Sequence, residues 1–462
     1  MSRTNMFGRR QFVTSALATL ALARHRAWGA ALAAPAGEPA RFRQDRFAVS
    51  FWVDPPADAH MDEYYAQIAA ANFTVVMGDF GATTTQAVSR QLDLCGKYGL
   101  KAVVNLPGYS GLPAGDIQSE NAAGRFANLP GYGGPRTPGI VATENRIKQA
   151  DQFPDHPACW GYRIWDEPST ALFPYLRFMV EHLRKRRPGK LGFINLLPTY
   201  ANDQQLGEHG NQPYEKYVAG FVREVNPDVL CMDHYPFMQP GRDTRDAYAA
   251  NLAVLRKYAL SRKIPFWNFF NDMAFDSHFD PTEEQIRWQI HTSLAYGAKG
   301  VLYFCYWTPP EFKAPALLTQ TGRLTHHYAQ AQRINARLKN WGPTLMQLTS
   351  TAIYRVPRGA DPAPILRGAP LQLQPGLTPG NYLIGVFNHA DGRTAVLLTN
   401  YSYAYTAWPA VSFAADAQNV SEVDPASGKE IPIRHDAANP GGHYIWLGAG
   451  DARLFLFHPT RI

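Results

Sequence analysis

The sequence has few charged residues, few cysteines and none of the common nucleotide- or zinc-binding motifs. Charged residues make up 18% of the 462 residues and hydrophobic residues 45%, so the chain can bury a large core and lacks the composition of a disordered protein. No GxGxxG, phosphate-binding loop or HExxH spacing occurs, which argues against dinucleotide, NTP and HExxH-type zinc sites. We therefore expect neither a cofactor nor a metal. We interpret His326 and His327, on a predicted helix, as surface or packing residues.

Cysteine occurs at only four positions, without the spacing of a redox motif or a Cys/His metal site. Three of the four lie in or beside predicted strands, among apolar residues, where a free thiol behaves as a small hydrophobic side chain. Buried free thiols are therefore the favoured interpretation, although a disulfide stays open for an exported protein. The four residues are Cys95, Cys159, Cys231 and Cys305.

Long apolar runs are also missing, and the N-terminus has the pattern of a cleaved signal. Arg9 and Arg10 precede a short apolar stretch at 12–23, and an A-x-A-like site ends at Ala33, which resembles a twin-arginine export signal. The stretch is too short to span a bilayer, although an uncleaved anchor is a less favoured alternative. We predict a signal peptide at 1–33 and export to the periplasm or beyond, with no membrane attachment after its removal.

The net charge of +7 reflects this leader. The first 33 residues hold five arginines and no acidic residue, and without them 40 basic residues face 38 acidic ones, a net charge of +2. Such a nearly neutral protein has no electrostatic footprint for nucleic acid or a membrane surface. Aromatic residues, by contrast, reach 13%; most belong to a core, but tyrosine and tryptophan also suit a cleft that stacks against sugar rings.

After residue 45, strand-like and helix-like runs alternate. Most of the strand-like runs are continuously apolar, as expected for parallel strands buried on both faces. Eight such units of similar spacing predict a (β/α)₈ TIM barrel at 45–345 of an α/β protein, in preference to a doubly wound sheet. The predicted strands are 47–53, 73–77, 101–106, 160–165, 191–196, 229–233, 266–270 and 301–306.

Two regions depart from this alternation. The loop at 107–138 is long and rich in glycine and proline, and loops at the carboxyl ends of barrel strands build active sites, so it is a candidate cleft wall. From 350 to 462, short alternating runs with many turn residues replace the helical pattern. They predict a C-terminal all-β accessory domain of sandwich type.

The segment 160–169, WGYRIWDEPS, has the strongest functional signal. Two carboxylates, Asp166 and Glu167, follow a strand at the end where barrel enzymes place catalytic residues. Pro168 predicts an extended Glu167, and strand alternation predicts that one carboxylate faces the barrel mouth and the other points aside. A carboxyl group beside Trp165 would lose water and have the raised pKa that a general acid needs. The alternative is a pair that caps the next helix.

The chain resembles the clan A glycoside hydrolases, which are (β/α)₈ barrels that mostly cleave β-linked sugars with retention. The resemblance rests on eight βα units, Glu167 at the end of strand four and the aromatic strand-eight run at 303–307. It implies that Glu167 is the acid/base, that Trp307 stacks under the sugar and that Tyr303 belongs to the aromatic floor. Asp166 stands where the clan usually has an asparagine that binds the sugar.

Strand seven departs from the clan, because no glutamate occurs where the nucleophile is expected. Three interpretations remain open. Asp272 is a displaced nucleophile; Asp233, which ends strand six, is the second carboxylate, with His234 and Tyr235 beside it as substrate-binding candidates; or the protein binds sugar without cleaving it. The distance between the carboxyl groups would decide, at about 5–5.5 Å for retention and about 6.5–9.5 Å for inversion.

Other polar and aromatic side chains at strand ends are further substrate-binding candidates, chiefly Asn195 and Trp52, with Tyr200 as another ring that could stack. The sequence thus predicts an exported glycoside hydrolase that acts on an oligo- or polysaccharide, with Glu167 as general acid/base. A non-hydrolytic carbohydrate-binding protein on a degenerate barrel is the alternative, and a lyase or metal-dependent hydrolase is a third possibility without a motif of its own. The sugar and the oligomeric state stay open.

Overall fold

The computed structural model describes residues 39–78, 80–105, 148–152, 155–238, 244–374, 379–414, 419–433 and 442–458. The chain divides into two compact units, Met1–Ala40 and Arg41–Ile462, and every element below belongs to the second. The predicted signal peptide at 1–33 and the predicted cleft-wall loop at 107–138 lie outside the described residues. Within the described residues, no helix combines the length and the apolar character needed to cross a membrane.

All eight predicted barrel strands are present, each within two residues of its predicted ends. They form two parallel four-stranded sheets, in the orders β2-β3-β4-β5 and β1-β8-β7-β6. Their residues are almost all buried, as their apolar composition predicts. The strands are β1 (Ala48–Phe51), β2 (Val75–Met77), β3 (Lys101–Val104), β4 (Cys159–Asp166), β5 (Leu191–Asn195), β6 (Leu230–Asp233), β7 (Phe266–Asn271) and β8 (Gly300–Phe304).

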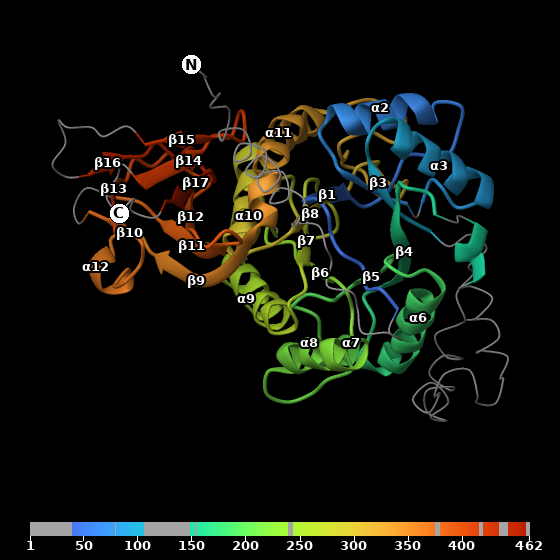
Figure 1. Cartoon of the computed structure of the whole chain (residues 1–462). Coiled ribbons are helices and arrows are strands. Elements are labelled where there is room, and N and C mark those ends of the chain that lie inside the picture. Colours follow the sequence, from blue (N-terminus) through green and yellow to red (C-terminus); the bar gives the residue numbers. More distant parts are fainter. Residues whose placement is uncertain are drawn as a thin grey trace, which may run out of the picture. The chain divides into compact units, whose positions relative to one another are not determined.

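Backbone hydrogen bonds connect the two sheets at both of their edges. Thr74, just before β2, donates to Val49 of β1 (2.9 Å). At the other edge, Leu196, just after β5, donates to Cys231 of β6 (2.9 Å) and forms a parallel bridge with Met232. The helices lie outside these strands (Figure 1). Helices therefore cover the outer face of each sheet, and strand side chains fill the space on the inner face.

The helices follow the predicted amphipathic pattern. In α3, for example, Val88, Leu92 and Cys95 share one buried face. The predicted start of α10 is confirmed, because Thr282 and Gln285 form a reciprocal capping box. The helices are α2 (Met61–Ala70), α3 (Thr85–Lys97), α6 (Phe173–Arg186), α7 (Asp203–Leu206), α8 (Pro213–Glu224), α9 (Arg245–Arg262), α10 (Glu283–Ala295) and α11 (His326–Met346), with short 3-10 turns η1 (Gln149–Gln152) and η2 (Thr170–Leu172).

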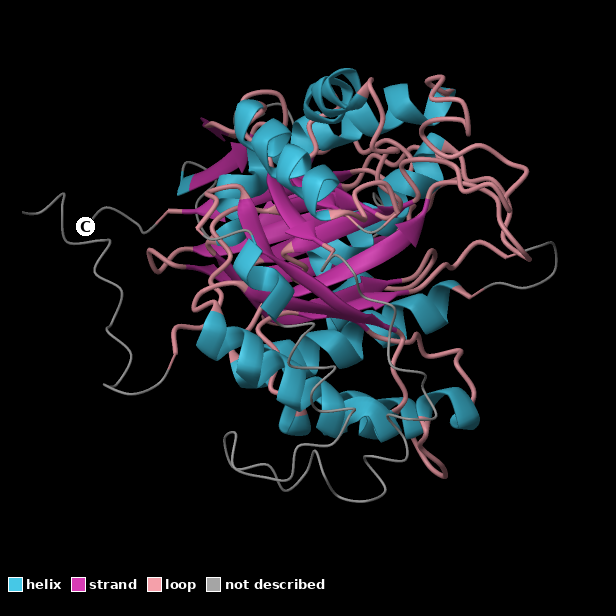
Figure 2. Cartoon of the chain, turned by 90° about the vertical axis from the view of Figure 1, so that its right-hand side faces the viewer, coloured by secondary structure: helices cyan, strands magenta, loops and turns pink. Residues whose placement is uncertain are grey.

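The C-terminal part is all-antiparallel apart from one short helix, α12 (Pro362–Ile365). One sheet has the order β15-β14-β17-β12-β11-β9 and the other β10-β13-β16, and apolar residues of both share one core. Figure 2 draws the whole chain from the right-hand side of Figure 1, with the strands at the centre and helices above and below them. The strands are β9 (Leu348–Val356), β10 (Leu371–Leu373), β11 (Tyr382–His389), β12 (Thr394–Asn400), β13 (Ala410–Phe413), β14 (Val420–Val423), β15 (Glu430–Pro432), β16 (His443–Tyr444) and β17 (Ala452–Phe457).

The centre of the six-stranded sheet is buried on both faces, because α10 and α11 cover the face opposite the smaller sheet. Trp288 of α10 donates to the Tyr401 carbonyl (3.2 Å), and Trp341 of α11 donates to the Val423 carbonyl (2.8 Å). From Ala395 to Asn400, β12 is therefore buried at every position, and its apolar run does not alternate. All four cysteines are buried and free, which confirms their favoured interpretation.

Replacing Asp451 by Asn is expected to weaken the contact between α11 and the six-stranded sheet. Asp451 precedes β17, is buried, and pairs with Arg337 of α11. Burial by itself would raise the pKa of Asp451, but the Arg337 charge, the nearby His291 and the hydrogen bonds that Asp451 accepts together lower it. Loss of this charged hydrogen bond should cost about 2 kcal/mol, seen as a lower midpoint of thermal unfolding. The matched control Asp391→Asn breaks an exposed pair with Arg393 and should change little; equal losses in both variants would contradict the prediction.

Candidate active site

Glu167 follows β4 directly, at a place where the strand is irregular. The pairing of β4 with β5 shifts by one residue between Arg163 and Trp165, and a bulge of this kind turns the side chains that follow it. Glu167 itself has a left-handed backbone (φ 48°), whereas the Pro168 rule predicts an extended one, so that prediction was wrong. Such a conformation costs about 1–3 kcal/mol in a non-glycine residue and is concentrated at functional sites. Here the Glu167 N–H donates to the Asn195 carbonyl (2.9 Å), which holds the turn.

The turn brings three carboxyl groups into one cluster. The Asn195 Nδ2 donates both to Asp166 Oδ1 (3.2 Å) and to Asp233 Oδ1 (3.1 Å), and Asp233 shares a hydrogen bond with Glu167. Strand alternation predicts that Asp166 and Glu167 point to different sides. That prediction was wrong, because both carboxyl groups belong to the same cluster. Asn195 is therefore a bridge between carboxylates.

Electrostatics in this cluster favour a retained proton. Glu167 is exposed as a residue, but partial burial of its carboxyl group, together with the neighbouring Asp166 carboxylate, raises its pKa to about 7. Burial, followed by the Glu167 and Asp166 charges, raises the pKa of Asp233 well above its usual range. Two carboxyl groups that share a hydrogen bond in this setting titrate as a pair and do not both ionise near neutral pH. The pair can thus offer a proton to a bound molecule.

Arg163, which the sequence analysis did not single out, belongs to the same group. Its guanidinium lies 3.9 Å from Asp166 Oδ2 and stacks on the Trp52 ring, 4.4 Å from the ring centre. Trp52 is only 8% exposed, so this face of its indole packs against Arg163 and is closed to a sugar. The signal that could have identified Arg163 is a charged residue inside an otherwise apolar strand.

Tyrosines border the carboxyl pair. Tyr200, after β5, keeps 41% of its surface exposed and packs edge-on against His234. Tyr235, after β6, is buried; burial and the nearby Asp233 charge raise the pKa of its phenol, which keeps it neutral. Trp307, after β8, is half-buried and packs edge-on against Tyr64 (5.2 Å). Its predicted stacking role stays a prediction.

Two predicted binding residues point away from the cluster. His234 is fully buried between β6 and α9, where its Nδ1 lies 3.0 Å from Asn251 Oδ1, and burial lowers its pKa to about 4. Tyr303 is fully buried and donates its hydroxyl to Asn335 of α11 (2.9 Å). Both face the layer between strands and helices, because neighbouring residues on a strand point in opposite directions. Their prediction as sugar contacts was wrong.

Asp272, the predicted displaced nucleophile, lies one residue past β7 and is fully buried. Neither oxygen of its carboxyl group has a hydrogen-bond partner within the described part of the chain. Burial, and then the Asp280 charge, raises its pKa well above the usual range, whereas Asp166 and Asp233 are the groups that act on Glu167. The structure therefore unites Glu167 with Asp233 and does not bring Asp272 into that pair.

Asp272→Asn is expected to stabilise the protein near neutral pH. A carboxyl group whose pKa is raised by folding stabilises the folded state only at low pH, and this contribution is lost as the pH rises above the unfolded value of about 4. The variant should unfold like the wild type near pH 4 and melt about 2–4 °C higher at pH 7, as followed by circular dichroism. The control Asp276→Asn, at an exposed position of the same loop, should not differ. Unchanged stability with lost activity would instead make Asp272 catalytic.

A cavity of about 470 Å³ lies at the other end of the strands. Its lining includes Phe47, Thr74 and Leu100, which precede β1, β2 and β3, and Leu338 and Gly342 of α11. Because Glu167 lies at the carboxyl end of β4, this cavity is separate from the carboxyl pair. In barrel proteins the amino ends of the strands serve stability, and the carboxyl ends serve catalysis.

No protein-family model matches the chain, and no curated protein matches it in sequence. Its fold, however, is found among solved structures. A family 39 glycoside hydrolase from the gut symbiont Bacteroides cellulosilyticus WH2 is 15% identical with a TM-score of 0.50, and the match covers 89% of this chain and 81% of that one. A catalytic mutant of a GH42 β-galactosidase from G. stearothermophilus is 9% identical with a TM-score of 0.53, covering 91% and 100%.

The chain has the fold of clan A glycoside hydrolases. The predicted resemblance is thereby confirmed for the architecture, over about nine-tenths of the chain. At such low identity the likeness carries the fold alone, since one barrel supports many chemistries. Function therefore has to be argued from the carboxyl cluster.

Proposed function

We propose that the chain is a glycoside hydrolase in which Glu167 is the general acid/base. The observation that carries this proposal is the carboxyl group of Glu167, which has a pKa of about 7 and a hydrogen bond to Asp233 at the carboxyl end of a parallel strand. A general acid works best when its pKa lies near the working pH. Cleavage of a glycosidic bond needs such a proton on the leaving oxygen.

In this mechanism Glu167 donates its proton to the glycosidic oxygen as the bond to the anomeric carbon breaks. Water supplies the hydroxyl group that the anomeric carbon gains, and the proton of that water returns to the carboxyl pair. Asp233 interacts directly with Glu167, and burial together with the Glu167 and Asp166 charges raises the pKa of Asp233 well above its usual range, so Asp233 keeps its proton near neutral pH. Asp233 therefore acts through Glu167, by holding the shared proton, and is a positioning residue.

The same proposal includes the wider architecture. The eight strands close into one (β/α)₈ barrel, supported by the hydrogen bonds at both sheet edges. Residues 45–345 form the barrel, 350–462 the accessory β-domain, and 1–33 an export signal, supported by the twin arginines and the short apolar stretch. The substrate is a carbohydrate of the periplasm or the medium.

Carbohydrate binding without hydrolysis is the second candidate, and one observation favours it. Strand seven ends in Asn271, and Asp272 directly after it is fully buried, so the end of this strand presents no exposed carboxylate. A barrel without a group that assists attack on the anomeric carbon could keep the aromatic rim and bind sugar. Tyr200 and Trp307 would then carry the interaction.

Sugar release from plant and microbial polysaccharides and from aryl glycosides separates the two candidates. The mature wild-type protein is incubated with each substrate, and reducing sugar or released phenol is measured beside calorimetric binding of the same sugars. Release above a heat-treated control supports the hydrolase. Binding without any release would overturn it in favour of the second candidate.

Asp233→Asn is expected to lower kcat on a cleaved substrate by about tenfold or more, with KM little changed. The pH profile should also lose one of the two ionisation steps of the pair, because only Glu167 remains to titrate. The control Asp228→Asn removes a buried carboxylate that pairs with Arg184, and it should lower stability without changing the shape of the profile. A two-step profile retained by Asp233→Asn would contradict the shared proton.

A further inference from the structure

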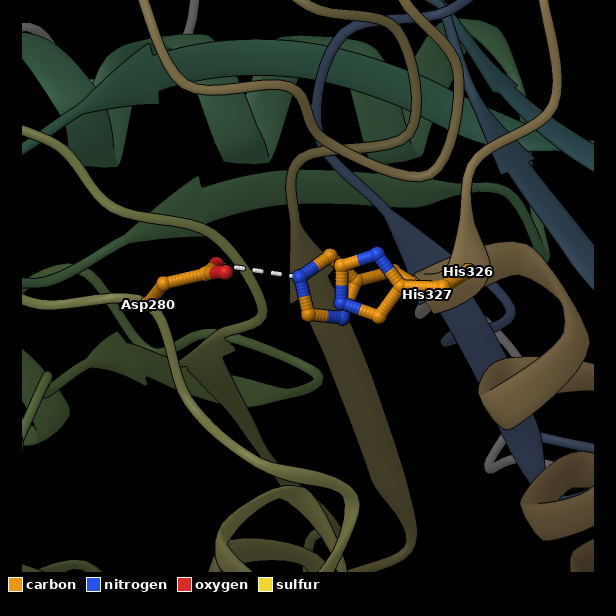
Figure 3. Close-up of side chains that lie close together, drawn as sticks. All are labelled: Asp280, His326 and His327. Atoms are coloured by element: carbon orange, nitrogen blue, oxygen red, sulfur yellow. Dashed lines mark hydrogen bonds and ion pairs between the residues drawn. The ribbon is translucent and has the colours of Figure 1, made fainter.

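Three potential metal ligands, one from a loop and two from a helix, converge at the start of α11. Each of Asp280, His326 and His327 can supply one ligand atom, and these atoms all lie within 4.8 Å of one another. Figure 3 shows the Asp280 carboxyl group directed at the two imidazole rings. Asp280 lies between β7 and α10, and the histidines are the first residues of α11. The sequence shows no metal spacing here, because 46 residues separate Asp280 from His326.

The local structure holds this arrangement in place. The Thr325 hydroxyl caps α11 by accepting from the His327 N–H (3.2 Å) and donates to the Leu317 carbonyl (3.0 Å). His327 is 1% exposed, whereas Asp280 and His326 are exposed. One ligand is thus fixed by packing, and the other two are open to solvent, from which an ion can enter.

The surroundings of the His327 ring favour a cation. Its Nδ1 lies 2.8 Å from Gln330 Oε1, and its Nε2 lies 3.0 Å from Asp280 Oδ1. Both neighbours are acceptors in this arrangement, but a neutral imidazole has only one N–H to donate. If Nδ1 donates to Gln330, the Nε2 lone pair faces a carboxylate, and either a second proton on the ring or a metal ion between Nε2 and the carboxylate makes this contact favourable. An imidazole that donates one N–H to an acceptor and binds a metal through its other nitrogen is common in metal sites.

We propose that Asp280, His326 and His327 bind a divalent transition-metal ion, with Zn²⁺ as the ion that fits best. Two imidazoles and one carboxylate are ligands that zinc accepts, at about 2.0–2.2 Å. Tetrahedral geometry at these lengths puts two ligand atoms about 3.3 Å apart, close to the 3.0 Å between His327 Nε2 and Asp280 Oδ1. Three protein ligands leave the fourth position to water.

Such an ion would connect the loop before α10 to the first turn of α11. Both segments follow carboxyl ends of neighbouring strands, β7 and β8. Because the folded chain brings the ligands together and the unfolded chain does not, binding stabilises the folded state. The site goes beyond the proposed hydrolase function and is independent of it.

The test is Zn²⁺ binding by the untagged, full-length mature protein, measured by competition with a chromophoric chelator. We expect one equivalent per chain and a rise in the midpoint of unfolding with added Zn²⁺. Asp280→Asn and His326→Ala, both at exposed positions, should each weaken binding by about tenfold or more. Co²⁺ should give the visible absorption of a four-coordinate ion in the wild type and lose it in the variants.

His209→Ala is the matched control, because His209 also lies beside an aspartate, Asp203, at an exposed position but without a second histidine. It should bind like the wild type. Absence of an equivalent of bound Zn²⁺, or equal affinity in the wild type and the Asp280 and His326 variants, would overturn the proposal. Sugar release is not part of this readout, so the two proposals fail separately.

Discussion

Glu167→Gln is expected to lower the rate of sugar release by about 10²–10⁴-fold. Glutamine has nearly the same shape, so it can keep a hydrogen bond to Asp233, but it has no proton to give to the glycosidic oxygen. The loss should fall on kcat, with sugar binding retained, because the change removes an interaction needed only in the transition state. Initial rates on the best substrate, with calorimetric binding, measure both quantities.

Glu181→Gln is the matched control for this variant. Glu181 lies on α6, at the surface, where it pairs with Arg177 one helical turn away (2.9 Å). Its replacement should leave the rate within about twofold, since exposed pairs contribute little. Unchanged release in Glu167→Gln, on a substrate that the wild type cleaves, would remove Glu167 from the mechanism.

The pH dependence of kcat/KM should report the same carboxyl group. Because the pKa of Glu167 is raised to about 7, the acid form is present below that pH and is lost as the pH rises through it. The rate should therefore fall about tenfold for each pH unit above about 7. Profiles between pH 4 and 10, on a substrate whose leaving group needs protonation, measure this limb; a rate that stays level to pH 9 would contradict it.

Asp166→Asn should move the fall of kcat/KM with rising pH to lower pH. After burial, the Asp166 carboxylate is the next cause of the raised pKa of Glu167, and asparagine removes its charge while still accepting from Asn195. Asp203→Asn, at an exposed position on α7, should leave the limb in place. Equal profiles for Asp166→Asn and the wild type would show that burial alone sets the pKa of Glu167.

Much of the fold could be predicted because strand burial is visible in composition. Runs such as Val229–Met232 are apolar throughout, as expected for a strand that is covered on both faces. The end of an apolar run also marks the carboxyl end of a strand, and Glu167 and Asp233 were identified as candidates because they lie at such ends. The C-terminal strand β12 shows the limit, since its second buried face comes from α10 and α11 of the barrel part.

The composition of the site could be predicted only in part. Side-chain direction depends on the local backbone, and after the irregularity in β4 Asp166 and Glu167 meet in one cluster, whereas strand alternation predicts opposite sides. His234 and Tyr303 were assigned to the sugar site because they are a histidine and a tyrosine at strand ends. Successive residues of a strand point in opposite directions, and these two point toward the helices, where they are buried. Arg163 was missed because its contacts with Asp166 and the Trp52 ring depend on the folded structure.

By itself, the sequence determined the alternation of elements and the identity of the acid candidate, because periodicity and strand ends are local properties of the chain. The tertiary structure decided which side chains meet. Asn195 joins two strand ends, Asp233 reaches Glu167 across β5, and Asp280 reaches His327 across 47 residues. Burial and the Asp166 carboxylate raise the pKa of Glu167, and Asp280 meets the two histidines in the proposed zinc site. Both depend on distances through space, which spacing along the chain does not contain.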